Sequence, residues 1–357
     1  MRKSDDEIYP HIAGLCIGWN TASAQTGNDW IQQKIDSLVK SKAVPGIMVG
    51  ISDQGVRRYY SGGFANKATR QLFDTATQVE IGSITKTMTA YLLTAVLQEQ
   101  RISDTTAIGP YLPDSVRTNP HLSTIRFVEL MNHTSGLPRL PDNINLTVKN
   151  PLQPYAAYGP EQLYAYLAKA IPDSNHKVSY SNLGAGLAGI LAARISGIPY
   201  EQLLKKYITI PFGMHHTDTS AAPGRPFSTG YYNEQPVEYW TMHVLKPAGG
   251  VKSDAADMLN YLEQLIRNQQ SAVVGSITTP TASINNRLLV AKGWHILIMP
   301  NQSSLFWHNG GTFGFSTFCA FHKESGKALF LSVNAFNKNN IGDAFGIEIM
   351  TKLLQYP

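Results

Sequence analysis

The stretch VEIGSITKTMT, residues 79–89, places Ser83 three residues before Lys86, where an apolar pattern with helical spacing begins. The apolar positions of this pattern are Ile84, Met88, Leu92 and Ala95. Three residues are close to one helical turn, so Ser83 and Lys86 are expected to be neighbours at the start of a helix with a buried face. This spacing predicts that the Ser83 hydroxyl and the Lys86 amine lie side by side in the folded protein.

Length and composition indicate a globular protein with a large core. The chain has 357 residues, of which 43% are hydrophobic and 15% charged, enough for one large core or two lobes around a cleft. The net charge of +5 is spread without a block of five like charges, so no nucleic-acid partner is expected. Cys16 and Cys319 stand outside any CxxC or metal-ligand spacing, and neither a disulfide framework nor a metal site is predicted.

The first 25 residues differ from the rest. Arg2 and Lys3 precede an apolar patch at residues 12–19 and the sequence Ala22-Ser23-Ala24, which resembles a secretory signal and its cleavage site. Acidic residues at positions 5–7 are unusual in such a leader. We expect residues 1–25 to be a signal, giving a periplasmic or secreted protein, or else an N-terminal extension of a cytoplasmic one. No later apolar run reaches the roughly 18 to 20 residues that span a bilayer, so no stable membrane insertion is expected.

Strand patterns at the two ends of the chain enclose a mainly helical middle. The helical patterns cover residues 29–40, most of 80–270, and 341–354. The strand patterns cover residues 46–52, 56–60, 294–299, 304–307, 316–322 and 328–333, with hairpin turns at 53–55 and 324–327. Residues 137–160 hold five prolines and no clear period, which predicts a long irregular loop of the kind that often borders a binding site.

This order of elements predicts an α/β fold of the α+β type. One antiparallel sheet would be built from both chain ends and flanked by terminal helices, with an inserted, mainly helical lobe. A single catalytic domain over residues 26–357 is expected, with a sheet lobe at about 26–65 and 285–357 and a helical lobe at about 66–284. A cleft would lie where the lobes meet.

The pair Ser83 and Lys86 can act as a catalytic unit. A serine hydroxyl is a poor nucleophile until a base takes its proton, and a lysine one turn away is within reach. The helix N-terminus also stabilises the oxyanion that develops there. A lysine base must be neutral, and moving its pKa from about 10.4 to about 7 requires roughly 4 to 5 kcal/mol from burial or nearby positive charge. Two further Ser-x-x-Lys pairs, at 37–40 and 174–177, are expected to be structural.

Two other motifs supply polar groups that suit this chemistry. A strand-like alternation over residues 177–181 contains Tyr180 and leads to Asn182 before a glycine-rich apolar helix. A tyrosine hydroxyl can relay a proton, and an asparagine amide can orient a lysine and bind a carbonyl. The segment His308-Asn309-Gly310-Gly311 ends one strand pattern shortly before the next, where a side chain and a backbone N–H can line a cleft.

Taken in order, Ser83-Ile84-Thr85-Lys86, Tyr180-Ser181-Asn182 and His308-Asn309-Gly310 resemble the three motifs of the penicillin-recognising serine hydrolases. The tyrosine and the histidine are similar to those of the branch that contains class C β-lactamases, D-alanyl-D-alanine carboxypeptidases, D-aminopeptidases and related esterases. The segments NHTSGL, residues 132–137, and GGVKS, residues 249–253, also resemble segments of this branch. The resemblance covers nearly all of residues 28–355.

The resemblance implies a role for each motif residue. Ser83 would be the acylated nucleophile, and Lys86 and Tyr180 would share the general-base and general-acid steps. The backbone N–H groups of Ser83 and Gly311 would form the oxyanion hole, each donor contributing on the order of 3 kcal/mol. The implied substrate-binding residues are Asn182, His308, Asn309, Gly310 and Gly311. No metal or cofactor is implied.

His308 stands where many members of the branch carry lysine. Histidine near pH 7 is only partly charged, which weakens recognition of a substrate carboxylate and therefore a β-lactamase assignment. Arg139, Lys246 or Lys252 can supply positive charge instead. The expected activity is hydrolysis of D-amino-acid peptides, of carboxypeptidase or aminopeptidase type, or of related amides and esters. The alternatives are a β-lactamase or carboxylesterase of the same family, and a penicillin- or peptidoglycan-binding sensor that barely turns over.

Other patterns are expected to be structural. The segment 184–189 fits G-x-G-x-x-G but lacks the acidic residue that a dinucleotide site needs at the end of a second strand, and its small residues predict close helix packing. We expect His133 to fix its loop by a hydrogen bond, His215 and His216 to be solvated, and Cys319 to be a core residue.

Overall fold

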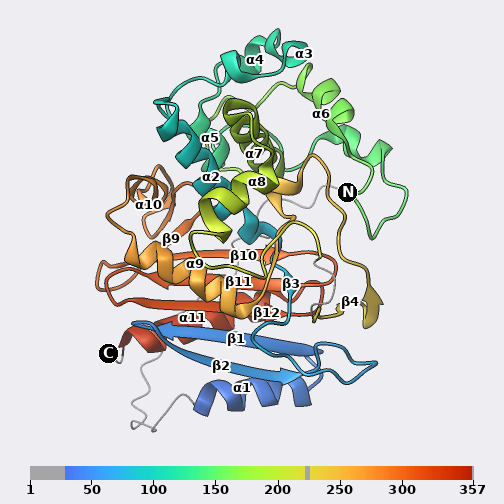
Figure 1. Ribbon diagram of the computed structural model, residues 1–357, viewed down its shortest axis with the longest axis vertical. Coiled ribbons are helices and arrows are strands. Elements are labelled where there is room, and N and C mark those ends of the chain that lie inside the picture. The colour runs from blue at the N-terminus through green and yellow to red at the C-terminus, as the bar shows by residue number, and fades with distance from the viewer. Residues whose placement is uncertain (1–28, 222–225, 356–357) are drawn as a thin grey trace.

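Eight antiparallel strands form the central sheet of the computed structural model, which describes residues 29–221 and 226–355. The predicted signal or extension and Cys16 lie outside these residues. In spatial order the strands are β2 (Val56–Gly63), β1 (Gly46–Asp53), β12 (Lys327–Val333), β11 (Ser316–His322), β10 (Ser304–Gly311), β9 (His295–Ile298), β8 (Leu288–Val290) and β7 (Ala282–Asn285). Strand β1 pairs with β12, so both chain ends build one sheet, as the sequence predicts (Figure 1).

The hairpin turns fall where the sequence places them. Gln54 and Gly55 have φ angles of 51° and 88° between the paired residues Asp53 and Val56, the left-handed conformations that a tight two-residue hairpin requires. Gly326, in the turn between β11 and β12, has a φ of 68°. Strands β7 and β8 were not predicted, because segments of four and three residues carry too little alternation to identify.

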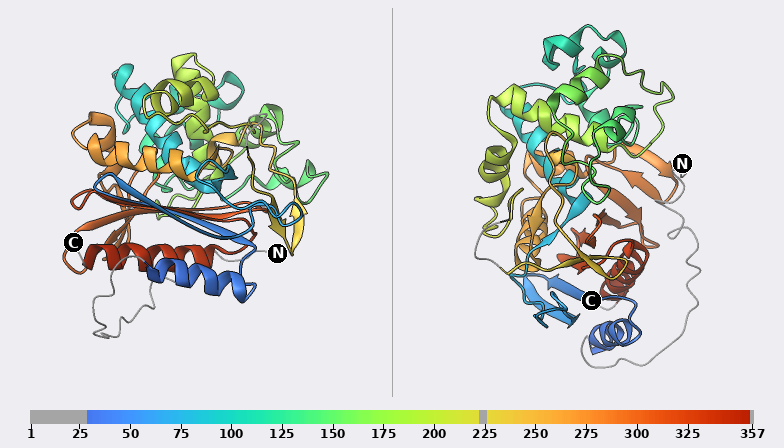
Figure 2. Two further views of the ribbon diagram at one scale, coloured as in Figure 1. Left: turned by 60° about the horizontal axis from the view of Figure 1, so that its bottom comes forward. Right: turned by 90° about the vertical axis from the view of Figure 1, so that its right-hand side faces the viewer.

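Helices α1 (Asp29–Lys40) and α11 (Asn339–Gln355) cover one face of the sheet (Figure 2). Alternate residues of β1, Ile47 and Val49, join the apolar cluster on this face. The intervening Met48 belongs to the larger cluster on the opposite face, which extends into the helical lobe. Because strand side chains alternate in direction, the sheet is apolar on both faces and is buried between two layers.

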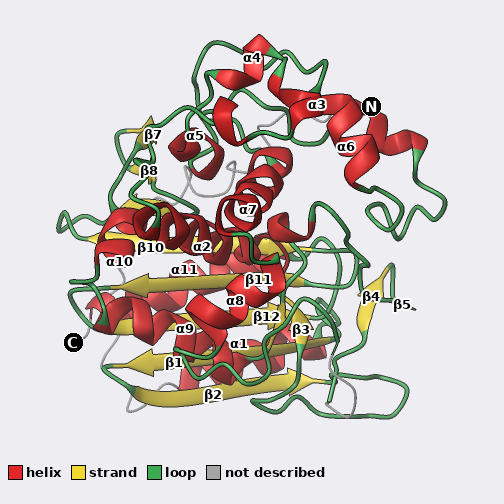
Figure 3. Cartoon of the chain, turned by 45° about the horizontal axis from the view of Figure 1, so that its top comes forward, coloured by secondary structure: helices red, strands yellow, loops and turns green. Residues whose placement is uncertain are grey.

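The opposite face carries α9 (Ala255–Arg267) and the helical lobe. The other α-helices are α2 (Thr85–Glu99), α3 (Asp114–Arg117), α4 (Pro120–Ser123), α5 (Phe127–Met131), α6 (Pro160–Leu167), α7 (Asn182–Ser196), α8 (Tyr200–Leu204) and α10 (Ala272–Thr278). Figure 3 shows α3, α4 and α6 standing clear of the long strands. Short 3₁₀ turns are η2 (Gly82–Ile84), η3 (Gly109–Tyr111), η4 (Asp142–Leu146) and η6 (Lys246–Ala248), and η5 (Lys205–Thr209) is a π-helical turn. Two further two-stranded sheets pair β3 (Val79–Glu80) with the distant β6 (Lys252–Ser253), and β4 (Gly230–Tyr232) with β5 (Gln235–Val237) in a short hairpin.

Glycines of the G-x-G-x-x-G segment allow η6 to pack closely on α7, which confirms the packing role predicted for them. A Cβ atom on Gly186 would lie 2.6 Å from Leu245 Cδ2, and one on Gly189 would lie 2.3 Å from Pro247 Cβ. Side chains at these two positions would therefore push η6 away from α7. This contact fixes the position of the Ala248 carbonyl at the end of η6.

Helix α7 is also the most apolar segment of the lobe, and its burial bears on the membrane prediction. Among the described residues, no single helix is long and apolar enough to cross a bilayer. Helix α7 and the following segment Tyr200–Thr209 have the required length and apolarity only when taken together, and the two segments are bent by 87° relative to each other. Cys319 in β11 is a buried, free thiol, which confirms its prediction as a core residue.

Candidate active site

Ser83 lies in the 3₁₀ turn η2, which leads directly into α2. Lys86, in the first turn of α2, places its Nζ 2.8 Å from Ser83 Oγ, within hydrogen-bonding distance. The predicted contact between the hydroxyl and the amine therefore exists. It forms because the 3₁₀ turn continues directly into the α-helix, with helical φ and ψ angles at Ile84 and Thr85, so that positions three residues apart are about one turn apart.

Lys86 is a buried amine whose second contact is a carbonyl. Its side chain is 3% exposed, and Nζ donates a hydrogen bond of 2.6 Å to the Ala248 carbonyl oxygen. Burial lowers the pKa of Lys86 well below its usual range, and the nearby charge of Arg139 lowers it further. The neutral amine that a general base requires is therefore favoured by this environment.

Tyr180 lies over the lysine. Its ring centre is 4.8 Å from Lys86 Nζ, and its side chain is 6% exposed. His133 supports the ring from one side, with ring centres 4.5 Å apart. His133 Nδ1 accepts a hydrogen bond from the Ser181 N–H at 3.2 Å, and the His133 carbonyl accepts one from the Ser179 N–H at 2.8 Å, so the predicted loop-fixing role of His133 is confirmed.

These hydrogen bonds also correct one prediction. Residues 177–181 read as a strand from their alternation, but they form no ladder in the structure. Their backbone instead bonds to the loop of His133, which has the left-handed φ of 65° and follows α5. The backbone partner of residues 177–181 is thus a loop and not a strand. The periodicity of a sequence does not show which kind of partner a segment has.

Asn182 is the first residue of α7. The side chain of Ser181 caps this helix, accepting a hydrogen bond of 2.8 Å from the Gly184 N–H. The side chain of Asn182 is 9% exposed and lies beside the hydroxyl of Tyr155, from the long loop before α6. Asn182 is thereby fixed at the helix start, two residues beyond Tyr180.

The third motif lies within a strand, which corrects its predicted position after a strand end. Strand β10 continues four residues beyond Trp307, through Gly311. A Cβ atom on Gly310 would lie 2.0 Å from the Ile81 carbonyl oxygen, and one on Gly82 would lie 2.6 Å from the Gly311 nitrogen. Only glycines permit this approach. As a result, the backbone nitrogen of Gly311 lies beside the turn that carries Ser83.

His308 is enclosed, and its surroundings favour the neutral imidazole. Its side chain is 1% exposed, and Nδ1 lies 2.6 Å from the Asn309 carbonyl oxygen. A carbonyl can only accept, so Nδ1 carries the proton and Nε2 is left as an acceptor. Nε2 is buried without a hydrogen-bond partner among the described residues. Burial lowers the pKa of His308 well below its usual range, and the neighbouring His295 acts in the same direction.

Asn309 was predicted to bind substrate, and its side chain points away from the site. Its amide donates a hydrogen bond of 2.7 Å to Asp343 Oδ2 on α11. Alternation along β10 places Asn309 and Trp307 on the face covered by α1 and α11, and His308 on the other. Only the backbone of Asn309 can contribute to the site. Burial raises the pKa of Asp343 to about 7.

Arg139 is the candidate cation that lies beside the motif residues. Its guanidinium carbon is 5.2 Å from the centre of the Tyr180 ring, and the residue is exposed. Lys246 instead forms an ion pair with Glu201. Lys252 is buried, where its amine lies 3.3 Å from the Thr219 carbonyl oxygen, and burial lowers its pKa.

Glu80 was missed by sequence reasoning. This buried carboxylate accepts hydrogen bonds from the Trp240 N–H at 2.6 Å and the Thr312 hydroxyl at 2.7 Å. It thereby joins the segments before Ser83 and after Gly311 to a third segment near residue 240. Burial raises the pKa of Glu80. The sequence feature that could have identified Glu80 is its position as a single acidic residue between the apolar Val79 and Ile81, just before Ser83.

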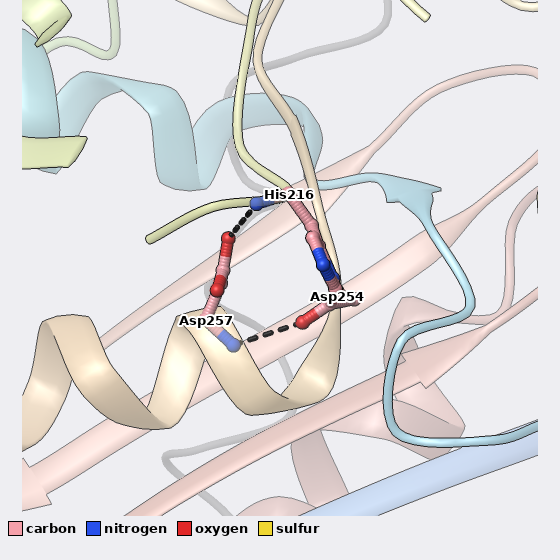
Figure 4. A group of neighbouring side chains, drawn as sticks. All are labelled: His216, Asp254 and Asp257. Carbon is pink, nitrogen blue, oxygen red and sulfur yellow. Dashed lines mark hydrogen bonds and ion pairs between the residues drawn. The ribbon is translucent and has the colours of Figure 1, made fainter. Parts of the chain in front are cut away.

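His216, Asp254 and Asp257 form a group with the composition of a metal site (Figure 4). Asp254 caps α9 by accepting from the Asp257 N–H at 2.8 Å, and its second oxygen lies 2.5 Å from His216 Nδ1. Asp257 accepts from the His216 N–H at 2.6 Å. These contacts are a helix cap and its supports, and they correct the expectation that His216 is solvated; His215 is exposed.

Comparison with known proteins connects this geometry to a family. The family model described as Beta-lactamase matches residues 31–347. A β-lactamase of Providencia stuartii is 31% identical over 243 residues, which are 65% of this chain and 59% of that protein. The D-alanyl-D-alanine-carboxypeptidase/endopeptidase AmpH of Escherichia coli K12 is 27% identical over 246 residues, which are 67% of this chain and 62% of that protein. The matches thus span about three fifths of these relatives.

Solved structures extend the similarity of fold over more of the chain. A class C β-lactamase from Rhodobacter sphaeroides has a TM-score of 0.79 and 21% identity, covering 92% of this chain and 100% of that one. A β-lactamase/D-alanine carboxypeptidase from Pseudomonas syringae has a TM-score of 0.77 and 22% identity, covering 92% and 98%. At this identity the likeness concerns the fold, and it agrees with the predicted sheet and inserted helical lobe.

Proposed function

The chain belongs to the β-lactamase family, and we propose that it is a serine hydrolase that works through a covalent acyl-enzyme on Ser83. The observation that carries the proposal is the contact of 2.8 Å between Ser83 Oγ and Lys86 Nζ, formed by an amine whose burial favours the neutral state. A neutral amine at this distance can take the hydroxyl proton as the oxygen attacks.

In the proposed acylation, Ser83 Oγ attacks the substrate carbonyl carbon while Lys86 Nζ accepts the Oγ proton. The tetrahedral oxyanion would be stabilised by the backbone N–H groups of Ser83 and Gly311, which come from neighbouring segments. The bond from the carbonyl carbon to the leaving nitrogen or oxygen then breaks. The leaving atom receives a proton from Lys86, directly or through the Tyr180 hydroxyl, and the acyl group remains on Ser83.

In the proposed deacylation, water replaces the leaving group. The same amine and phenol would accept its proton as the water oxygen attacks the acyl carbon, and the proton would return to Ser83 Oγ as the ester bond breaks. The product is the free acid. Lys86 and Tyr180 thus carry the protons in both steps. No atom changes its oxidation state, so the scheme needs no redox partner.

We propose D-amino-acid peptides and related amides or esters as the substrate class. The neutral, enclosed His308 supports this choice, since it offers an acceptor rather than a cation where a substrate carboxylate would otherwise be bound. A β-lactamase activity is the second candidate. It is favoured by the named relatives and by Arg139, whose charge lies beside Tyr180. A sensor with negligible turnover is the non-enzymatic alternative.

A substrate panel with intact-mass analysis tests these proposals. D-alanyl-D-alanine peptides, D-amino-acid amides, nitrocefin and p-nitrophenyl esters would be compared with wild-type protein and with Ser83→Ala. We expect turnover of a D-amino-acid amide or ester, and a mass adduct that is absent in Ser83→Ala. Turnover retained by Ser83→Ala would contradict the assignment. A β-lactam adduct that persists would indicate a sensor, and rapid nitrocefin turnover would indicate a β-lactamase.

A further inference from the structure

Five aromatic side chains from separate segments form a continuous row, called here the aromatic wall: Tyr155, Trp240, Phe313, Phe336 and Tyr232. Ring centres are 5.1 Å apart between Tyr155 and Trp240, 5.2 Å between Trp240 and Phe313, and 5.2 Å between Phe313 and Phe336. Tyr232 closes the row, 4.8 Å from Phe336 and 5.5 Å from Phe313.

The wall begins at the site residues. Phe313 is two residues after Gly311, whose nitrogen lies beside the Ser83 turn. At the other end, the Tyr155 hydroxyl lies beside the side chain of Asn182. Between them, Trp240 is held by its backbone N–H to Glu80, three residues before Ser83. The wall is therefore joined to the segments that carry all three motifs, through Glu80 before Ser83, Asn182 after Tyr180, and Thr312 after Gly311.

Hydrogen bonds fix the wall in place. Gln153, from the long loop that contains Tyr155, donates to the Tyr239 carbonyl at 2.8 Å and accepts from the Thr241 N–H at 2.9 Å. Glu80 also binds the Thr312 hydroxyl next to Phe313. These contacts hold rings from three segments in register before any ligand binds, which is the preorganisation that a binding surface needs.

The chemistry of the wall is apolar and uncharged. Trp240, Phe313, Phe336 and Tyr232 are only half-buried, so part of their ring surface remains available for contact. Partly exposed aromatic clusters beside a few fixed polar groups are typical of small-ligand sites. Trp240 Nε1 is in addition a buried donor without an acceptor among the described residues.

We propose that the aromatic wall binds the acyl half of the substrate, and that this half carries an uncharged, flat, apolar group. The proposal rests on the serine hydrolase function proposed above. The leaving group must lie beside the acid that protonates it, Lys86 or Tyr180, which leaves the acyl half to lie along the wall. Among D-amino-acid substrates, this selects an aromatic residue over alanine on the acyl side.

Two matched pairs of substrates test the proposal: p-nitrophenyl phenylacetate against acetate, and D-phenylalanine p-nitroanilide against D-alanine p-nitroanilide. The readout is the ratio of kcat/KM within each pair, corrected for spontaneous hydrolysis. We expect wild-type ratios of about tenfold or more, and a loss of about fivefold or more in Phe313→Ala and in Trp240→Ala, as aromatic contact in a pocket typically provides. Phe313→Leu serves if the alanine variant does not fold.

Tyr207→Ala is the control, since Tyr207 is a partly buried aromatic beside Glu99 at the far end of α2. Its ratios should stay within about twofold of wild type. A ratio near one in wild-type protein, or an unchanged ratio in both wall variants while Ser83 is still acylated, would overturn the proposal and leave the hydrolase function intact. Absence of any Ser83 adduct and any turnover would overturn both.

Discussion

Asn309 of β10 donates a hydrogen bond of 2.7 Å to Asp343 of α11, on the face of the strand opposite His308. The strand that carries the third motif is thus fixed from behind by a carboxyl group. The second oxygen of that carboxyl is enclosed without a hydrogen-bond partner among the described residues. This arrangement makes protonation of Asp343 a determinant of stability.

Asp343→Asn should remove part of the pH dependence of stability. Burial raises the folded-state pKa to about 7, whereas an unfolded aspartate has a pKa of about 3.9. Between these values the folded state holds the proton and the unfolded state does not, so this contribution to stability falls as the pH rises from about 4 to about 7. The measurement is the free energy of unfolding in urea near pH 5 and near pH 8. The loss of this free energy between the two pH values should be smaller in the variant than in wild-type protein, by on the order of 1–3 kcal/mol.

The control for this measurement is Asp114→Asn, because the Asp114 side chain is 89% exposed. It should leave the pH dependence of unfolding as in wild-type protein. An Asp343→Asn variant with the same pH dependence as wild type would show that the carboxyl does not hold its proton in the folded state.

Gly310→Ala should impair both activity and stability. The new Cβ would meet the Ile81 carbonyl oxygen at 2.0 Å, so β10 or the Ser83 turn must shift, at a typical cost of about 1–3 kcal/mol. A displaced oxyanion donor typically lowers kcat by about 10² to 10³. Gly275→Ala in α10 is the matched control, because nothing lies within 4 Å of its new Cβ. It should be neutral or stabilising by about 0.4–1 kcal/mol, and equal behaviour of the two variants would contradict the close contact.

Arg139→Gln should move the acidic limb of the pH profile of kcat/KM. Activity by the proposed route requires neutral Lys86, so the rate rises with pH through the pKa of Lys86. The charge of Arg139 lowers that pKa, and its removal should shift the limb to higher pH. The shift should shrink as salt is added, since Arg139 is exposed. Arg194→Gln, at an exposed arginine in the last turn of α7, should cause no shift; a shift to lower pH in Arg139→Gln would refute the coupling.

His308→Lys should change substrate preference toward carboxylates. Lysine would replace an enclosed neutral acceptor with a cation, so kcat/KM for nitrocefin relative to an uncharged p-nitrophenyl ester should rise by about tenfold or more. A buried charge also reduces the stability of the fold. Loss of folded protein lowers the rate for both substrates equally, so it does not change the ratio. His308→Gln keeps a neutral side chain and should not raise the ratio. A rise in both variants would point to altered pocket shape rather than charge.

The sequence predicted the elements with strong local patterns. The helix of residues 29–40 and the strand of residues 316–322 have the predicted bounds, since each has a clear period and a boundary set by turn residues. The contact of Ser83 with Lys86 was also predictable, because it lies within one helical turn. The convergence of the three motifs required the resemblance to a family, as nothing local relates residue 83 to residues 180 and 308.

The remaining features depend on contacts between distant segments. Strand β10 extends through Gly311 because the glycines let it run along the Ile81 carbonyl, whereas the same glycines read as a strand end in sequence. Asn309 belongs to the far face because the register of the long strand continues past Trp307. The buried Glu80 and the Ala248 carbonyl act through partners more than 150 positions away, and no periodicity reports such pairs.

The pairing of β1 with β12, and of the Ser83 turn with Gly311, has a consequence for biosynthesis. A ribosome must release the chain through Val333 before the N-terminal hairpin can complete its pairing with its neighbour in the sheet. Until Gly311 is in place, the proposed nucleophile lacks one of the two donors proposed for its oxyanion hole. If the proposed mechanism holds, a chain that stops before Gly311 should not be acylated on Ser83, so that covalent labelling of Ser83 would report on the assembly of the sheet.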